Sequence, residues 1–365
     1  MLQRTARAAV YDAPNTPFAI RHYPLRDVHA DEVLVQVVMS TICRSDIHSY
    51  HGHRPNPCPG ILGHEIIGVI DQLGADIKRD MRGDPLAVGD RITWTEYFHH
   101  GESYYRDVHD MPQKSQGVRK YGHDLVEEDP HFLGGFAEYC YVVPGTGILK
   151  IPEELSNEEA TPINCGVATM VCVTEATQIQ MGDVVAIQGL GLLGLYGCAM
   201  AKTRGARLVI GLDAVADRLE TAKKFGADFT IDISGREEDD IVAQVRELAP
   251  PDGVDAVIEV CGVPAVIPAG MKMLRIGGRY TLAGLVNPDA HVTVDANLFV
   301  KKWITLRGIH NYHPRHPIQA LDFVVANRGR FPFKEIVDSK FKLDDLAEAF
   351  KRASERSVLR AAIVP

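Results

Sequence analysis

Long apolar stretches are missing from this sequence. No run of consecutive apolar residues reaches the roughly 18 that a membrane-spanning helix needs. Residues Met1 to Val10 lack the apolar segment and small-residue cleavage site of a secretion signal. We therefore expect a cytoplasmic protein without a membrane span. Basic residues are outnumbered 48 to 39 by acidic ones, and the formal net charge of −9 argues against non-specific binding to nucleic acid.

Cysteine is sparse and unevenly placed. The chain has seven cysteines in 365 residues, and none lies between Cys58 and Cys140. An odd number at scattered positions does not suit a disulfide framework and favours free thiols and metal ligands. We interpret five of the seven as small buried hydrophobic residues; these are Cys58, Cys140, Cys172, Cys198 and Cys261.

The periodicity of the sequence changes near its middle. Up to about residue 150, short alternating runs such as 31–40 end at turns rich in glycine and proline, which predicts a mostly-β, barrel-like module. After Pro162, apolar strand-like runs alternate with helix-like runs, which predicts a doubly wound parallel sheet. We expect an α/β protein with one domain formed by 1–160 and 301–365, and a second domain formed by 161–300.

A glycine motif follows the first strand-like run of the second domain. Gly189, Gly191 and Gly194 form G-x-G-x-x-G at the start of a helix-like run, and Asp213 ends the next strand about 20 residues further on. Such glycines let the backbone approach a pyrophosphate at a helix N-terminus. A carboxylate at Asp213 can accept hydrogen bonds from ribose hydroxyls and would repel a 2′-phosphate, which favours NAD over NADP. The alternative is a turn that only aids helix–strand packing.

Two residues of the first domain have the chemistry of zinc ligands. Cys43 and His64 stand about 20 residues apart, and thiolate and imidazole are good ligands for a catalytic zinc, which keeps three protein ligands and one open position. Such a wide spacing is not a local motif. Taken singly, Cys43 is more typical of a core thiol than of a metal ligand.

Five motifs stand in order along the chain. They are C-R-S-D-x-H at 43–48, G-H-E-x-x-G at 63–68, GGFAEY at 134–139, NCGVAT at 164–169 and the glycine motif. Together they make the chain similar to the zinc-containing medium-chain alcohol dehydrogenases over its whole length. The resemblance implies a GroES-like catalytic domain, a Rossmann NAD-binding domain, one catalytic Zn²⁺ per chain, and hydride transfer between a primary or secondary alcohol and NAD.

The resemblance also implies roles for individual residues. Cys43, His64 and Cys165 match the three catalytic zinc ligands of the family. Glu65 matches a carboxylate close to the metal, and Asp46 matches the acceptor that orients the histidine ligand.

Further positions match the proton relay and the cofactor contacts of the family. Ser45 and His48 match the groups that carry the alcohol proton to solvent. The residues that match cofactor contacts are Arg44, Thr169, Arg218 and Arg360, the last as a second pyrophosphate contact. The family further implies a homodimer or homotetramer, and we expect the joining edge strand at 297–309.

The polar segment 97–131 departs from the family pattern. Many relatives bind a structural zinc there through four cysteines, but the corresponding positions hold His100, Ser103, Arg106 and a residue near Ser115. We predict that the structural zinc is absent and that hydrogen bonds, together with aromatic packing by Tyr97, Tyr104 and Tyr105, hold the segment. The alternative is a replacement metal site, with candidate ligands among His99, His100, Asp107, His109, His123 and His131.

The substrate is less well defined by the sequence. Residues 307–316 are rich in histidine and arginine and resemble a branch of the family linked to phosphonate catabolism, which implies a small hydroxyalkyl phosphonate. The side chains expected to bind its anion are His51, His53, Arg54, His310, His313 and Arg315. A basic surface turn is the alternative interpretation.

Two other functions fit the same fold. A polyol or sugar dehydrogenase often lacks structural zinc, but its third ligand tends to be a carboxylate, against which Cys165 counts. A zinc-free quinone reductase or a non-catalytic binding protein would lack the ligands Cys43 and His64.

Overall fold

The computed structural model describes residues 4–286, 288 and 290–365, which form two compact units. We call residues 1–168, 313–328 and 333–365 the first unit, and residues 169–312 and 329–332 the second unit. The chain returns to the first unit at residue 313 rather than at the predicted 301, because strand β16 (Thr305–Gly308) still pairs with β15 (Leu274–Leu282) of the second unit.

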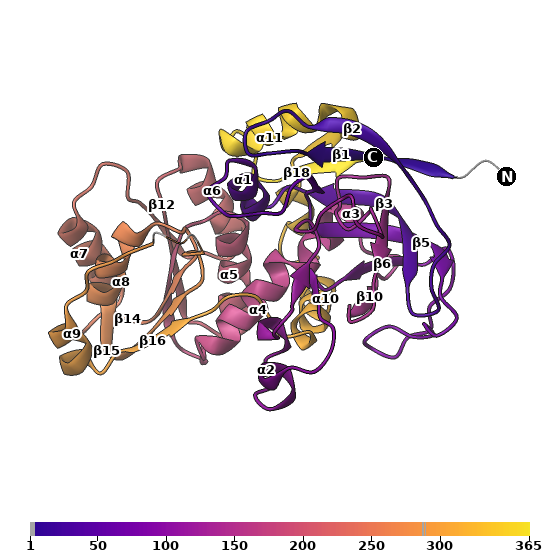
Figure 1. The fold of residues 1–365 in the computed structure, drawn as a ribbon. Coiled ribbons are helices and arrows are strands. Elements are labelled where there is room, and N and C mark those ends of the chain that lie inside the picture. Colours follow the sequence, from indigo (N-terminus) through magenta and orange to yellow (C-terminus); the bar gives the residue numbers. More distant parts are fainter. Residues whose placement is uncertain (1–3, 287, 289) are drawn as a thin grey trace. The chain divides into compact units, whose positions relative to one another are not determined.

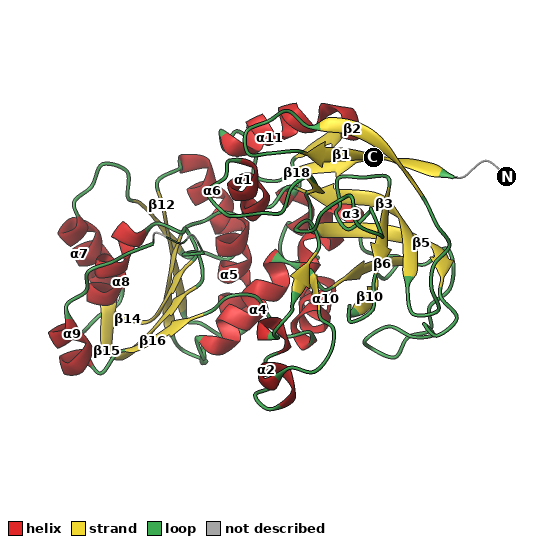
Figure 2. Cartoon of the chain, in the orientation of Figure 1, coloured by secondary structure: helices red, strands yellow, loops and turns green. Residues whose placement is uncertain are grey.

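The first unit is built mainly from antiparallel strands (Figure 2). A seven-stranded sheet has the order β10-β6-β5-β3-β18-β17, with β9 also paired to β3, and a three-stranded sheet has the order β2-β1-β4. The strands are β1 (Thr5–Tyr11), β2 (Ala19–Pro24), β3 (Val33–Thr41), β4 (Gly60–Ile61), β5 (Glu65–Leu73), β6 (Arg91–Trp94), β9 (Tyr139–Val142), β10 (Ile148–Lys150), β17 (Ser339–Lys342) and β18 (Ala361–Val364). The predicted strand at 31–40 is therefore present as β3.

Strand β3 lies in the middle of this sheet. Seven of its nine residues are buried, because it pairs with β5, β9 and β18. The helices of the unit are α1 (Arg44–Tyr50), α2 (Tyr104–Asp107), α3 (Asn157–Ala160), α10 (Arg315–Asn327) and α11 (Leu346–Ser354), and a small ladder joins β7 (Tyr97–Phe98) to β8 (Arg119–Lys120). The mostly-β module predicted from the alternating runs is confirmed.

The second unit contains one six-stranded sheet with the order β13-β12-β11-β14-β15-β16, in which every pair is parallel. Its other strands are β11 (Val184–Gln188), β12 (Leu208–Asp213), β13 (Phe229–Asp232) and β14 (Val254–Glu259). Its helices are α5 (Leu192–Thr203), α6 (Ala216–Lys224), α7 (Glu238–Leu248), α8 (Ile267–Met273) and α9 (Ala296–Lys302), and α4 (Gly166–Ala176) begins at the boundary (Figure 1). This is the predicted doubly wound sheet.

One element differs in the structure from its prediction. The segment expected as an edge strand over 297–309 begins as helix α9, since Asp295 caps that helix by accepting a hydrogen bond from the N–H of Asn297. Only Thr305–Gly308 form the edge strand β16. Over the described part of the chain, no helix is both long enough and apolar enough to span a membrane.

Candidate functional site

One buried carboxylate fixes two of the predicted metal ligands. Asp46 lies in the first turn of α1 and is completely buried. Its Oδ2 accepts the N–H of Cys43 at 2.8 Å, and its Oδ1 accepts the Nδ1–H of His64 at 3.2 Å and the N–H of Gly63 at 3.2 Å. Because Nδ1 of His64 is held in this way, its Nε2 is the nitrogen left to bind a metal.

The third ligand is placed by a residue that we did not predict. Cys165 precedes α4, and its neighbour Asn164 is fully buried. The Asn164 amide donates hydrogen bonds to the carbonyl oxygens of His64, at 2.9 Å, and Trp94, at 2.8 Å. The loop that carries Cys165 is therefore bound directly to the strand ends that carry the histidine ligand.

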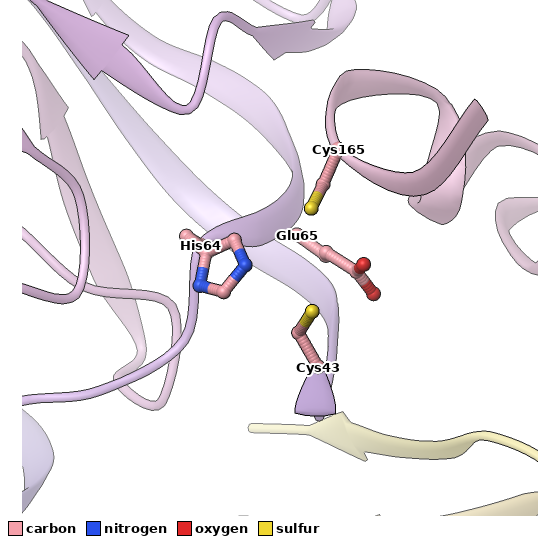
Figure 3. A group of neighbouring side chains, drawn as sticks. All are labelled: Cys43, His64, Glu65 and Cys165. Atoms are coloured by element: carbon pink, nitrogen blue, oxygen red, sulfur yellow. The ribbon is translucent and has the colours of Figure 1, made fainter. Parts of the chain in front are cut away.

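The three predicted ligands meet in one place. The sulfurs of Cys43 and Cys165 and the ring of His64 face a common space (Figure 3). With Glu65 they form a group whose ligand atoms all lie within 4.8 Å of one another, the one such group of three or more in the described residues. Two sulfurs and one imidazole nitrogen are the donors of a catalytic zinc site, and bonds of about 2.0–2.3 Å fit separations of this size.

The acid–base state of the group also suits a cation. A hydrogen bond from Cys165, together with His64, lowers the pKa of the Cys43 thiol, whereas the bond to Cys43 and burial raise the pKa of Cys165. One thiolate is thus favoured before any metal binds, and a bound metal would stabilise the second.

Glu65 is held by hydrogen bonds from two neighbours, Arg360 and Thr41. Its Oε1 accepts a hydrogen bond from Nη2 of Arg360 at 2.8 Å, and Thr41, its partner across the β3–β5 ladder, bonds to Oε2. Burial raises the pKa of Glu65 to about 7, although the Arg360 guanidinium opposes that rise. Arg360 is itself buried and bonds to the carbonyl of Ile42. A partner at the metal cluster was not expected for Arg360, and its contact with the NAD pyrophosphate stays a prediction.

The predicted relay residues flank the cluster. The hydroxyl of Ser45 lies 3.4 Å from Nε2 of His64. His48 is half-buried with its ring centroid 5.8 Å from that of His53, and burial, followed by Arg44, lowers its pKa. Arg44 is exposed at the start of α1. A neutral imidazole at His48 is suited to accepting a proton near neutral pH.

The glycine motif of the second unit shows three different environments. A Cβ on Gly189, where φ is +95°, would lie 2.6 Å from Cβ of Cys261, and a Cβ on Gly194 would lie 1.9 Å from the carbonyl oxygen of Gly189. Those two glycines serve the turn and the helix packing. A Cβ on Gly191 would meet no atom within 4 Å, although this residue is the N-cap of α5. The open space lies where the N–H groups of the first turn of α5 can bind a phosphate.

Comparison with known proteins identifies the family. The model for alcohol dehydrogenase GroES-like domains matches residues 29–153, and the model for zinc-binding dehydrogenases matches residues 193–326. The L-threonine 3-dehydrogenase of Pyrococcus horikoshii is 32% identical over 330 residues, with 88% of this chain and 87% of the relative covered. The chain belongs to the zinc-containing medium-chain alcohol dehydrogenase family.

Other family members have similar lengths and folds. The sorbitol dehydrogenase of Bacillus subtilis is 29% identical over 92% of this chain and 90% of its own. The crystal structure of an alcohol dehydrogenase from Thermotoga maritima matches with a TM-score of 0.94 and 27% identity, covering 99% of this chain and 100% of that one. The predicted GroES-like and Rossmann domains, and the prediction of an oxidoreductase of this family, are confirmed.

Asp213, the residue predicted to bind the ribose, is held by backbone hydrogen bonds. Asp213 is buried, and its two oxygens accept the N–H of Leu190 at 2.7 Å and of Val215 at 3.0 Å. Arg218 lies 3.8 Å from the same carboxylate, and Thr169 is half-buried in the first turn of α4. The bond to Leu190 fixes Asp213 against the glycine motif, but the contacts of Asp213, Arg218 and Thr169 with a cofactor stay predictions.

The polar segment 97–131 is organised by hydrogen bonds. Asp107 accepts the N–H of Ser103 at 2.8 Å and pairs with Arg106, while the Ser103 hydroxyl accepts the N–H of Gln116. Two of the four positions that hold cysteine in many relatives thus contribute to a local turn. Tyr97 is buried, whereas Tyr104 and Tyr105 are half-exposed and pack on each other and on His109.

Two of the six basic residues expected to bind a phosphonate, His51 and His313, have other partners. His51 bonds through its two ring nitrogens to Asn15, at 2.8 Å, and Ser354, at 3.2 Å. His313 pairs with Asp110 at 3.1 Å, and its Nδ1 accepts the N–H of Arg315. These contacts use His51 and His313 for local structure in the first unit.

Three polar residues beside the metal cluster, Glu96, Lys120 and Asn56, were not predicted, and His123 was considered only as a ligand of a replacement metal site. Glu96 is buried, with its Oε2 4.0 Å from Nε2 of His64 and its Oε1 3.4 Å from Nζ of Lys120. The ring of His123 stacks on that of His64 with centroids 6.0 Å apart, and its Nδ1 bonds to Asn56. No sequence motif marks Glu96, Lys120 or Asn56. The pairing of β7 with β8 brings Lys120 opposite Tyr97, the residue after Glu96.

Proposed function

We propose that the protein is an NAD-dependent zinc alcohol dehydrogenase that transfers hydride between a primary or secondary alcohol and NAD. The observation that carries the proposal is the convergence of Cys43, His64 and Cys165 within 4.8 Å. A zinc ion bound by these side chains would supply a Lewis acid that acidifies the alcohol hydroxyl. Membership of the family supports the reaction class.

The residues around the ligands are proposed to handle orientation and the proton. Asp46 keeps the His64 ring in the tautomer that leaves Nε2 free of hydrogen. Ser45, whose hydroxyl lies next to Nε2 of His64, accepts the alcohol proton and passes it towards His48. The lowered pKa of His48 keeps this imidazole neutral and ready to take the proton.

NAD rather than NADP is proposed as the cofactor. Asp213 is an anchored carboxylate at the end of β12, and an anchored carboxylate there would hydrogen-bond a ribose hydroxyl and repel a phosphate on it. Arg218 lies 3.8 Å from the Asp213 carboxylate. This carboxylate offsets the positive charge of Arg218 and so weakens the attraction of Arg218 for a 2′-phosphate.

A screen of alcohols tests the function directly. Purified protein with measured zinc content is mixed with NAD or NADP and with neutral alcohols, polyols or hydroxyalkyl phosphonates, and cofactor reduction is followed by absorbance. We expect zinc-dependent reduction of NAD, faster than that of NADP. Absence of turnover with every alcohol by zinc-loaded protein would refute the proposal. Strong preference for the phosphonate would instead support a phosphonate substrate, although His51 and His313 are bonded to other residues of the protein.

We also propose that the protein forms a homodimer or homotetramer through the edge of the sheet in the second unit. Strand β16 is exposed at that edge, and apolar side chains surround it: Trp303 is 82% exposed, Val300 81% and Leu306 42%. An unpaired edge beside apolar side chains is a site for strand pairing between copies. A cytoplasmic location stays a prediction from the sequence.

A charge on the edge strand is expected to dissociate the oligomer. Leu306→Lys places a cation on β16, and isolated strand edges carrying lysine resist pairing. We expect wild-type protein to have two or four times the chain mass by light scattering, and the variant to have the mass of one chain. The exposed control Val88→Lys, in the first unit, should leave the mass unchanged. A monomeric wild type would contradict the proposal.

A further inference from the structure

A groove in the second unit lies between helices α7, α8 and α9, and its volume is about 380 Å³. The residues that line it are Asp239, Val242, Ala243, Arg246, Lys272, Leu298 and Lys302. We propose that this groove binds a small organic carboxylate with an apolar tail. The inference goes beyond the proposed alcohol dehydrogenase function and does not depend on it.

The groove is separate from the glycine motif. Helices α7, α8 and α9 lie on one face of the six-stranded sheet, whereas α5, which begins after Gly191, lies on the other face (Figure 1). The apolar core beneath the groove contains side chains from α7, α8 and α9 and none from the described residues of α5. The metal ligands belong to the first unit. The groove is therefore formed by residues that take part in neither of the predicted sites.

The positive charge of the groove is only partly balanced by the protein. Lys272 pairs with Glu238, at 2.8 Å, and with Asp239, at 2.9 Å. The Arg246 guanidinium is exposed and forms no hydrogen bond or ion pair with a described residue. Because the whole chain has a formal net charge of −9, a basic groove is a local exception, and its field favours an anion.

Lys302 supplies a second cation, which the fold holds in place. Its Nζ donates hydrogen bonds to the carbonyl oxygens of Lys272, at 3.0 Å, and Leu274, at 2.5 Å. Since an ammonium group has three N–H donors, one is left for a ligand. Burial, followed by the charge of Arg246, lowers the pKa of Lys302. An anion bound by Arg246 and Lys302 would offset the repulsion between these two cations.

The lining of the groove indicates the class of ligand. A guanidinium presents paired donors that match the two oxygens of a carboxylate. Val242 is 6% exposed, Leu298 is partly buried and Ala243 is exposed, so apolar surface lies next to the cations. An alkyl tail would cover this surface, which is favourable, whereas an inorganic anion would leave it in water. The volume lies within the roughly 300–1,000 Å³ of small-molecule sites.

An NMR titration with hexanoate, without NAD or alcohol, tests the site. We expect saturable binding with a Kd of about 1 mM or lower. Arg246→Gln should weaken it by about tenfold or more, because a charge-assisted hydrogen bond is lost. The matched control Arg207→Gln changes an exposed arginine of the same unit outside the groove, and it should bind hexanoate as the wild type does.

Two analogues separate the charge of the ligand from its tail. Hexanamide has the tail without the charge, and acetate has the charge without the tail. Both should bind at least about tenfold more weakly than hexanoate. Absence of saturable hexanoate binding to wild type, equal affinity for hexanamide, or unchanged affinity in Arg246→Gln would each overturn the inference.

A further variant distinguishes the groove from the metal cluster. Cys43→Ser, which removes a proposed metal ligand, should bind hexanoate as the wild type does, and loss of binding there would assign hexanoate to the metal cluster and overturn the inference. If Arg246→Gln does not fold, Ala243→Trp replaces it, because residue 243 is exposed on α7 and a larger side chain would fill the groove. Unchanged hexanoate affinity in that variant counts against the proposal. None of these titrations measures turnover, so failure of the alcohol dehydrogenase function would leave them valid.

Discussion

Cys43→Ser is expected to lose its zinc and to lower kcat/KM for alcohol oxidation by about four orders of magnitude. A serine hydroxyl is a poor zinc ligand at neutral pH, and the Cys43 thiol is the one whose pKa the neighbours lower. The metal would stabilise the transition state by several kcal/mol as a Lewis acid, and this stabilisation is lost with it. Because each 1.36 kcal/mol changes the rate tenfold, the loss corresponds to about four orders of magnitude. Metal analysis and steady-state kinetics on the same sample measure both effects.

The backbone of this variant should stay in place, which makes the result interpretable. The N–H of residue 43 still bonds to Asp46, and Asp46 still holds the His64 ring. Cys58→Ser is the matched control, because Cys58 is a partly buried thiol outside the metal cluster, and it should keep both zinc and activity. Full activity of Cys43→Ser would mean that this sulfur is no ligand.

Gly191→Asp is expected to abolish NAD binding without destabilising the fold. Gly191 has φ −69° and ψ −168°, a conformation open to any residue, and nothing lies within 4 Å of an added Cβ. Aspartate is a favourable N-cap and its charge suits a helix N-terminus. The same charge and bulk fill the space where the pyrophosphate would bind. We expect the dissociation constant for NAD to rise by about 100-fold or more, with Tm unchanged or higher.

A second glycine variant separates binding from stability. Gly194→Ala places a Cβ 1.9 Å from the carbonyl oxygen of Gly189, so helix α5 must move and Tm should fall by several degrees, roughly the effect of 1–3 kcal/mol. Calorimetric titration with NAD and thermal unfolding of both variants distinguish the two roles. Normal NAD affinity in a folded Gly191→Asp protein would refute our assignment of this loop.

The sequence allowed prediction of the ligands but not of the side chains that position them. Cys43, His64 and Cys165 were identified because they belong to motifs that stand in a family order. Asn164 lies next to Cys165 in the same motif, but its bonds to His64 and Trp94 join segments far apart in the sequence. Such contacts are determined by the tertiary fold and leave no periodic or spacing signal.

The fold likewise contains elements that could be predicted from the sequence and one segment that could not. Alternating and βαβ patterns predicted the two kinds of sheet correctly, because burial of one or both faces dictates them. The segment 297–309 was predicted as one strand, yet it divides into α9 and β16, since the Asp295 cap starts a helix that Trp303, in the left-handed region with φ 54°, then ends. A short apolar run is compatible with either structure until its caps are recognised.

X-ray absorption at the zinc edge, with zinc quantified on the same active preparation, identifies the atoms that bind the metal. We predict one zinc per chain, bound by two sulfurs at about 2.3 Å and by one imidazole nitrogen at about 2.0–2.1 Å, with a lighter atom completing the shell. Zinc bound by nitrogen and oxygen alone, or full alcohol dehydrogenase activity in protein that holds far less than one zinc per chain, would contradict it.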